Sequence, residues 1–294
     1  MSGQLKEVRL RIKSVQSTQQ ITKAMKMVSA AKLRRAQDAI TQMRPYAVKL
    51  QEMLGNIIGS ADGDIAGALS TERPIEKVLI IAVSSDRGLC GGFNGNIWKQ
   101  VRNAVEERYK TQADKGNVHV LPLGKKIYEA VGRANIKMIE DFWTIYSDLT
   151  FENVKKAAEY ARNAFINKEY DRVEIVYNQF KNAGTQLIVS EQHLPIAKTT
   201  NNLKTASSND FIFEPNQEIL ITELMPKILN TQLYKAVLDS NASEHGARMT
   251  AMDKATENAE ELLKGLKISY NRARQAAITT ELTEIVSGAA ALNG

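Results

Sequence analysis

Residues 11–44, RIKSVQSTQQITKAMKMVSAAKLRRAQDAITQMR, contain no proline and carry apolar side chains three and four positions apart. With the residues just before them they form an apolar stripe, which consists of Leu5, Val8, Ile12, Val15, Ile21, Met25 and Val28. The spacing slips between Val15 and Ile21, which is typical of a coiled-coil seam with a stutter. We therefore expect one long N-terminal helix that buries this stripe against another helix.

The C-terminal end of the chain also lacks proline, from residue 227 to residue 294. Its small and apolar residues recur at helical spacing and are Ala247, Ala251, Ala255, Ala259, Ile278, Leu282, Ile285, Ala289 and Leu292. At a rise of about 1.5 Å per residue, this helix would reach roughly 100 Å and the N-terminal helix roughly 65 Å, too long for a compact domain. The two ends therefore predict long antiparallel helices that bury their stripes on each other as a rod. Gly246 would allow a local bend in that rod.

Between the two ends, apolar strands alternate with helical patterns. The expected strands are KVLIIAVSS (77–85), VHVLPLG (118–124), RVEIVYNQF (172–180) and TQLIVSEQHL (185–194). The expected helices are Asn96–Tyr109, Lys125–Ala134 and Asn153–Asn167. This alternation predicts an open α/β (Rossmann-like) domain inserted between the coiled-coil helices. The expected boundaries are 1–60 for the N-terminal helix, 75–197 for the α/β domain, 198–212 for a mobile loop and 213–294 for the C-terminal helix.

The composition fits a folded protein, with 294 residues of which 43% are hydrophobic and 24% are charged. No run approaches the roughly 18 to 20 apolar residues of a membrane-spanning helix, and the first residues lack the apolar core of a secretory signal. We therefore expect a chain that is not exported and does not insert directly into a membrane. Cys90 is the only cysteine, which excludes an internal disulfide and a zinc-binding cysteine pattern.

The positive charge is concentrated at the N-terminal end. The whole chain carries +6, whereas residues 1–44 hold ten basic residues against Glu7 and Asp38, a net +8. Three interpretations stay open for this basic helix: a solvated face, a surface for acidic loops of a partner protein, or the nucleic-acid contact of a DNA- or RNA-binding coiled coil. Residues 1–44 contain no aromatic side chain for stacking on bases, which disfavours nucleic acid.

A glycine-rich loop, SSDRGLCGGFNGN (Ser84–Asn96), leaves the first expected strand and enters a helix. Because α/β proteins often bind phosphate at such a place, a phosphate-handling enzyme is an alternative. The glycines form neither GxGxxG nor a P-loop, so a tight structural or contact loop fits better and no cofactor is expected. The three histidines, His119, His193 and His245, are scattered, so we expect neither a catalytic group nor a metal site.

Three stretches together resemble the gamma subunit family of F-type ATP synthases. The C-terminal runs SEHGARMTAMDKATENA (243–259) and YNRARQAAITTELTEIVSGAAAL (270–292) are similar to the most specific signature of that family. RIKSVQSTQQITKAMKMVSAAKLRRAQ (11–37) resembles its N-terminal helix, and the glycine-rich loop resembles the corresponding loop. The resemblance covers both ends and the centre of the chain in the family's order.

The resemblance implies a rotating, non-catalytic shaft of the proton- or sodium-driven ATP synthase, on the cytoplasmic face of a bacterial membrane. The implied partners are the alpha and beta subunits of the catalytic hexamer, the epsilon subunit and the ring of c subunits, with no nucleic acid. The positions that match contacts with the catalytic subunits are Met25, Asp86, Arg87, Lys99, Arg274, Gln275 and Thr279. The positions that match the foot on the membrane ring are Phe211 and Glu214.

Overall fold

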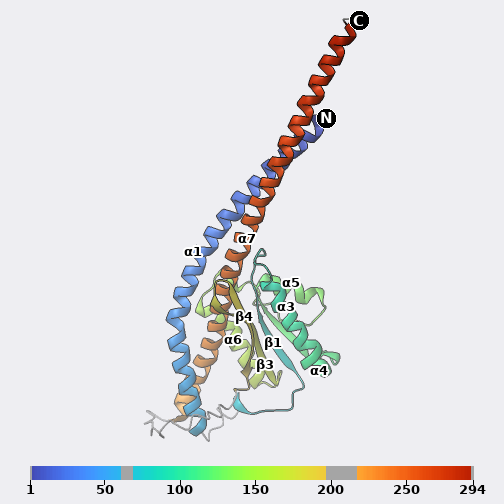
Figure 1. Cartoon of the computed structure of the whole chain (residues 1–294). Coiled ribbons are helices and arrows are strands. Elements are labelled where there is room, and N and C mark those ends of the chain that lie inside the picture. The colour runs from blue at the N-terminus through green and yellow to red at the C-terminus, as the bar shows by residue number, and fades with distance from the viewer. Residues whose placement is uncertain (1, 61–68, 197–216, 293–294) are drawn as a thin grey trace. The chain divides into compact units, whose positions relative to one another are not determined.

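The structure is a computed structural model of the chain, and it describes residues 2–60, 69–196 and 217–292 (Figure 1). The helices are α1 (Ser2–Ser60), α3 (Phe93–Asn103), η1 (Ala104–Arg108), α4 (Lys110–Asp114), α5 (Lys125–Arg133), η2 (Ile145–Ser147), α6 (Phe151–Ile166) and α7 (Gln217–Leu292). The strands are β1 (Val78–Val83), β2 (Val118–Leu123), β3 (Arg172–Asn182) and β4 (Thr185–Leu194). The prediction of two long terminal helices around an α/β region is confirmed.

The chain divides into two compact units, and each is described by itself. Unit 1 comprises Met1–Ser29 and Arg248–Gly294, and unit 2 comprises Ala30–Ala247. Both long helices pass from one unit into the other. The domain boundaries expected from the sequence assign each long helix to a domain of its own, and they stay predictions. The expected loop at 198–212 lies outside the described residues.

Unit 2 contains a mixed four-stranded sheet in the order β2-β1-β3-β4. β1 pairs in parallel with both β2 and β3, and β3 pairs with β4 as an antiparallel hairpin. All six residues of β1 are buried because the strand lies inside the sheet and is covered on both faces. The four strands expected from the sequence are confirmed.

Helices cover both faces of this sheet. On one face, α3 and α5 pack through Ile97, Val101 and Val131 against Ile80 and Val120. On the other face lie α6 and the first part of α7. Their buried contact residues include Ala157, Ala161, Phe165, Leu229, Leu233 and Val237, which pack against Ile81, Val173, Ile175 and Tyr177. The result is a three-layered α/β arrangement with separate apolar cores on its two sides.

In unit 1, α1 and α7 run antiparallel, since Thr22 meets Thr256 and Lys26 meets Asp253. The inward-facing positions of α1 repeat every three or four residues without interruption, through Leu5, Val8, Ile12, Val15, Gln19, Thr22, Lys26 and Ser29. The predicted stutter is therefore wrong. The sequence stripe had placed Ile21 and Val28 on the seam, but they are 56% and 57% exposed. The neighbouring polar residues Thr22 and Ser29 occupy the buried seam positions instead.

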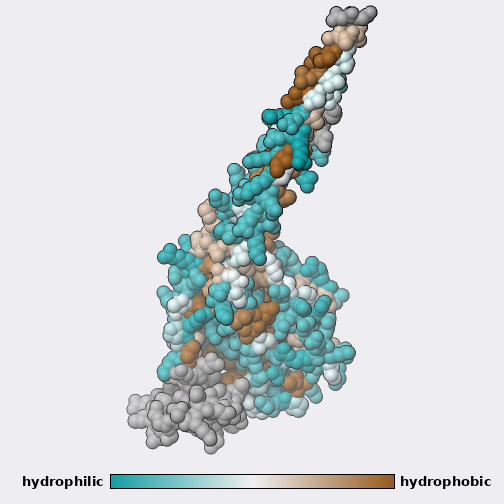
Figure 2. Space-filling view, viewed as in Figure 1, coloured by the Kyte–Doolittle hydropathy of each residue, from teal (hydrophilic) through white to brown (hydrophobic). Residues whose placement is uncertain are grey.

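The predicted stripe at the end of α7 is also not buried on α1. Ile278, Leu282 and Ile285 are 48%, 57% and 68% exposed, and Figure 2 shows hydrophobic surface along this end of the helix. Because the helices are antiparallel and Thr22 meets Thr256, α1 begins opposite the part of α7 near Ala276. Beyond that point no other helix among the described residues lies opposite α7, which explains the exposure.

Gly246 lies in unit 2, inside α7, against the hairpin between β3 and β4. A Cβ atom there would lie 3.1 Å from the carbonyl oxygen of Ala183 and 3.2 Å from its Cα. The glycine therefore allows a helix to pack closely on a turn, a role that differs from the bend we expected from helix propensity alone.

In the part of the chain that the structure describes, none of the helices contains an apolar stretch of the length needed to span a membrane.

Candidate functional site

The glycine-rich loop is held by bonds within itself. The Ser85 hydroxyl donates to the carbonyl oxygen of Arg87 at 2.7 Å and lies 2.9 Å from the side-chain oxygen of Asn94. The Asn94 amide group donates to the Cys90 sulfur at 3.2 Å. Cys90 is buried within this network, so the sole thiol is part of the packing of the loop.

The loop also caps the start of α5, the helix that follows β2. The backbone N–H groups of Lys125, Lys126 and Ile127 donate to groups of the loop. Each of these bonds is 3.0 Å long, and the acceptors are Asp86 Oδ1, the carbonyl oxygen of Ser85 and Ser84 Oγ. Since the donors of the first turn already have partners, this helix start offers little to a phosphate.

Gly124 makes this arrangement possible. Its φ of +114° lies in a region that favours glycine, and a Cβ there would come within 2.6 Å of the carbonyl oxygen of Ser84. The end of β2 can therefore approach the end of β1 closely enough for the loop to cap α5. These contacts support the interpretation of a tight structural or contact loop.

The residues predicted in and after the loop have different surroundings. Asp86 is half-buried and holds α5, so it has a structural role of its own. Arg87 and Lys99 are exposed. Sequence reasoning missed Leu89, which is 64% exposed and has a φ of +63°, an unusual backbone conformation for a branched apolar residue. Exposure and strain together make the tip of the loop a candidate contact surface.

The residues predicted on the long helices lie in unit 1. Arg274, Gln275 and Thr279 are exposed on α7, and the Thr279 hydroxyl donates to the carbonyl oxygen of Gln275 at 2.9 Å. Met25 is half-buried on α1, next to the Lys26–Asp253 pair. Asp253 and Arg274 are about 30 Å apart along α7, so Met25 does not join the other three in one cluster.

Polar pairs inside the helix seam of unit 1 were not predicted. Thr22 and Thr256 share a hydrogen bond of 2.8 Å between their hydroxyl groups, and Lys26 forms an ion pair with Asp253. A groove of about 430 Å³ opens beside them, lined by Gln19, Gln20, Lys23, Lys26, Met27, Asp253, Thr256 and Glu260. The spacing of three and four residues continues through polar positions of α1, so following the spacing without requiring apolar residues would have found this part of the seam.

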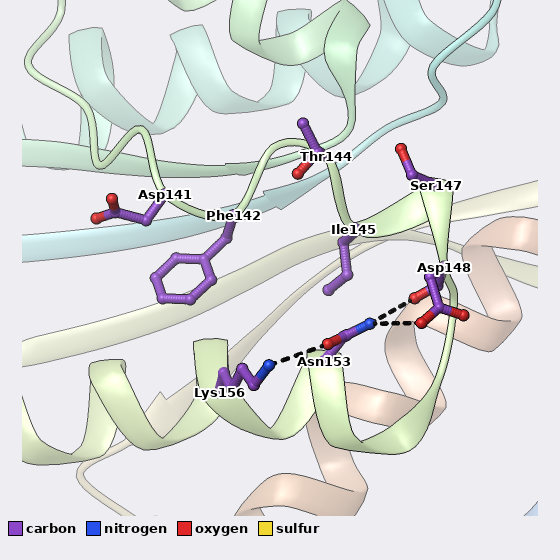
Figure 3. A pocket seen from close by; sticks show the side chains of 8 residues that line it. All are labelled: Asp141, Phe142, Thr144, Ile145, Ser147, Asp148, Asn153 and Lys156. Atoms are coloured by element: carbon purple, nitrogen blue, oxygen red, sulfur yellow. Dashed lines mark hydrogen bonds between the residues drawn. The ribbon is translucent and has the colours of Figure 1, made fainter.

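A second cavity, of about 300 Å³, lies in unit 2 beside the start of α6 (Figure 3). Three of its polar side chains bond to one another. Asn153 donates to the Asp148 carboxylate at 3.1 Å, and Lys156 donates to Asn153 at 3.3 Å. Thr150 accepts from the backbone N–H of Asn153 and caps the helix. The geometry fits a capped helix start that lies under an open depression.

Buried polar groups gather where α7 crosses β3 and β4. His193 is 1% exposed and its Nδ1 lies 2.9 Å from Gln232 Oε1; burial lowers the pKa of its imidazole to about 4. Asp239 is fully buried, and burial raises the pKa of its carboxyl although Arg44 opposes this. Burial likewise raises the pKa of the Glu191 carboxyl. These groups belong to the interior of unit 2.

Among the described residues, no three His, Cys, Asp or Glu side chains are grouped to hold a metal.

These features define a coiled-coil protein with an inserted α/β region. Its exposed side chains, at the end of α7 and at the tip of the glycine-rich loop, suit contact with other chains.

A family model described as ATP synthase matches residues 4–292. The chain is 52% identical to the ATP synthase gamma chain of Flavobacterium psychrophilum over 99% of both chains. It is also 52% identical to that of Cytophaga hutchinsonii, over 98% of this chain and 99% of the relative. The chain belongs to the ATP synthase gamma chain family.

A solved structure agrees with this assignment, and a second one shares the fold. The central stalk and c-ring structure of the Tetrahymena thermophila mitochondrial ATP synthase contains a chain with 27% identity and a TM-score of 0.58, matched over 80% of this chain and 99% of that one. A chain of the Euglena gracilis mitochondrial enzyme, solved as OSCP, F1 and c-ring, has 20% identity and a TM-score of 0.67, over 99% of this chain and 95% of that one. The second likeness concerns the fold alone.

Proposed function

We propose that this chain acts as the rotating central shaft of a rotary ATP synthase. It couples proton or sodium flow through a ring of c subunits to ATP synthesis and hydrolysis in a catalytic head of alpha and beta subunits. It has no active site of its own, and it works on the cytoplasmic face of a bacterial membrane together with an epsilon subunit. The observation that carries this proposal is the 52% identity to bacterial gamma chains over nearly the whole length.

The helix pair of unit 1 has the properties that a shaft needs. A single helix bends easily, whereas two antiparallel helices with an interlocked three-four seam resist bending and sliding. The exposed apolar residues at the end of α7, among them Ile278, Leu282, Ile285 and Val286, offer a surface to a surrounding protein. The basic residues of α1 add attraction to acidic surfaces, which raises association rates more than final affinity.

The contact residues are part of the same proposal. We infer that Arg274, Gln275 and Thr279 make contacts with the catalytic subunits that break and re-form during rotation, and their exposure on α7 supports this role. Met25, Asp86, Arg87 and Lys99 are proposed as further contacts. For Asp86, the bond to the Lys125 backbone means that a variant would also disturb α5. Phe211 and Glu214 lie outside the described residues, and their contact with the ring stays a prediction.

Co-expression with the alpha and beta subunits of the same organism tests the proposal. The chain should co-purify with them in one complex, and that complex should hydrolyse ATP. With the complete enzyme in membrane vesicles, ATP hydrolysis should drive ion transport that is lost when this chain is left out. A chain that does not enter the complex, or ion transport that persists without it, would contradict the proposed function.

A further inference from the structure

The β3–β4 hairpin of unit 2 contacts α7 through its far end. The Ser243 hydroxyl, on α7, donates to the carbonyl oxygen of Asn178 at 3.0 Å in a buried position. One turn further along the helix, Gly246 lets the backbone of α7 approach Ala183 in the hairpin turn. The regular pairing of the two strands shifts between Phe180 and Asn182. The end of the hairpin is therefore shaped to receive the helix.

Arg44 brings α1 to the same place. Its Nη2 donates to the carbonyl oxygen of Phe180 at 3.0 Å and to Asp239 Oδ1 at 3.1 Å. Phe180 belongs to β3 and Asp239 to α7, so one guanidinium group joins three elements. The Asp239 carboxylate is fully buried, whereas the Arg44 side chain is 47% exposed. Arg44 thus enters the interior from the rim of unit 2, although composition alone counted it among the surface charges of α1.

We propose that Arg44 is the positioning residue that fixes α1 to the β3–β4 hairpin and to α7, so that torque on the α/β region passes into both long helices. This inference rests on the proposed function as a shaft. Hydrophobic burial has no preferred direction, whereas hydrogen bonds weaken steeply when their geometry is disturbed. A planar guanidinium with two fixed acceptors therefore resists the shear that torque would impose on this junction.

The test compares ion transport with ATP hydrolysis in vesicles that contain the complete enzyme. Arg44→Ala should leave ATP hydrolysis within about twofold of the original enzyme and lower the ions transported per ATP by at least about twofold. Lys181→Ala removes one positive charge from the same hairpin, at an exposed side chain, and should leave this ratio unchanged. Arg44→Lys keeps the charge and should restore the ratio in part.

Arg44→Ala also leaves the buried Asp239 carboxylate without its cation, which could prevent folding. The double variant Arg44→Met/Asp239→Leu removes both charges, a replacement that often preserves stability. It should still show the lowered transport ratio. If either assembled variant transports as many ions per ATP as the original enzyme, the positioning role of Arg44 is wrong. If the enzyme with the original chain does not couple hydrolysis to transport, the proposed function itself fails.

Discussion

His193 is a buried histidine that must stay neutral in the folded chain, because burial lowers the pKa of its imidazole to about 4 while the unfolded chain keeps an ordinary value. Below that ordinary value the unfolded state binds a proton first, so stability falls as the pH falls. Between pH 7 and pH 5 the cost to the free energy of unfolding should be about 2 kcal/mol. Urea unfolding at several pH values measures it.

His193→Gln is the control for this prediction, since a glutamine does not titrate. Glu191 and Asp239 lie nearby with raised carboxyl pKa values, and their contribution has the opposite sign, because the folded state favours their protonated forms. Their effect is present in both proteins, so the difference between the two proteins isolates the histidine. Parallel loss of stability in both proteins would show that His193 is not responsible.

Two glycines of α7, Gly246 and Gly265, should respond oppositely to replacement by alanine, because only Gly246 packs against another part of the chain. Alanine in place of an exposed helical glycine gains about 1 kcal/mol, and Gly265 has no atom within 4 Å of a new Cβ, so Gly265→Ala should stabilise the chain. At Gly246 the new Cβ would press on the backbone of Ala183 at 3.1 Å. Overpacking costs about 1–3 kcal/mol, so Gly246→Ala should be destabilising on balance. Thermal unfolding followed by circular dichroism compares the two, and stabilisation by both variants would contradict the packing argument.

At the scale of elements, the seam of α1 gives a sharp comparison between exposed and buried apolar residues. Leu33 lies four residues after Ser29, where it continues the buried spacing of α1, and it is 5% exposed. Val28 is 57% exposed although it belongs to the apolar stripe of the sequence. Leu33→Ala should lower the free energy of unfolding by about 2–4 kcal/mol, and Val28→Ala should change it by less than about 0.5 kcal/mol. Urea unfolding distinguishes the two, and equal losses would favour the seam read from the apolar residues alone.

The elements themselves were largely predictable from the sequence. β1 is a run of six apolar residues, four of them β-branched, which is typical of a strand inside a sheet. The register of the long helices was not, because Thr22 and Ser29 occupy seam positions and a hydroxyl group gives no apolar signal. Thr22 finds its partner in Thr256, which is remote in sequence. Seam position here depends on a tertiary contact and not on hydrophobicity.

At the scale of the whole molecule, the residues predicted to contact other subunits came from the family resemblance. Taken one by one, these side chains have no chemical property that distinguishes them from ordinary surface residues. Arg274 and Gln275 are exposed polar residues of a helix, and nothing in their spacing separates them from solvated positions. Arg44 was counted only as a charge, because its acceptors on β3 and α7 are distant in sequence. Function in a shaft depends on surfaces that only the assembled partners complete.

Arg274, Gln275 and Thr279, called the latch, are expected to hold one rotary position and then release it. A charge-assisted hydrogen bond contributes about 1.5–3 kcal/mol and a neutral one about 0.5–1.5 kcal/mol, enough to favour a position and small enough to break at every step. Arg274→Ala/Gln275→Ala should therefore slow ATP hydrolysis by the assembled complex several-fold. Alanine is a good helix former, so the helical circular dichroism of the chain should not change. Lys267→Ala removes a charge from an exposed position on the same helix and serves as the control. Hydrolysis at the original rate in the double variant would mean that the latch side chains are only solvated.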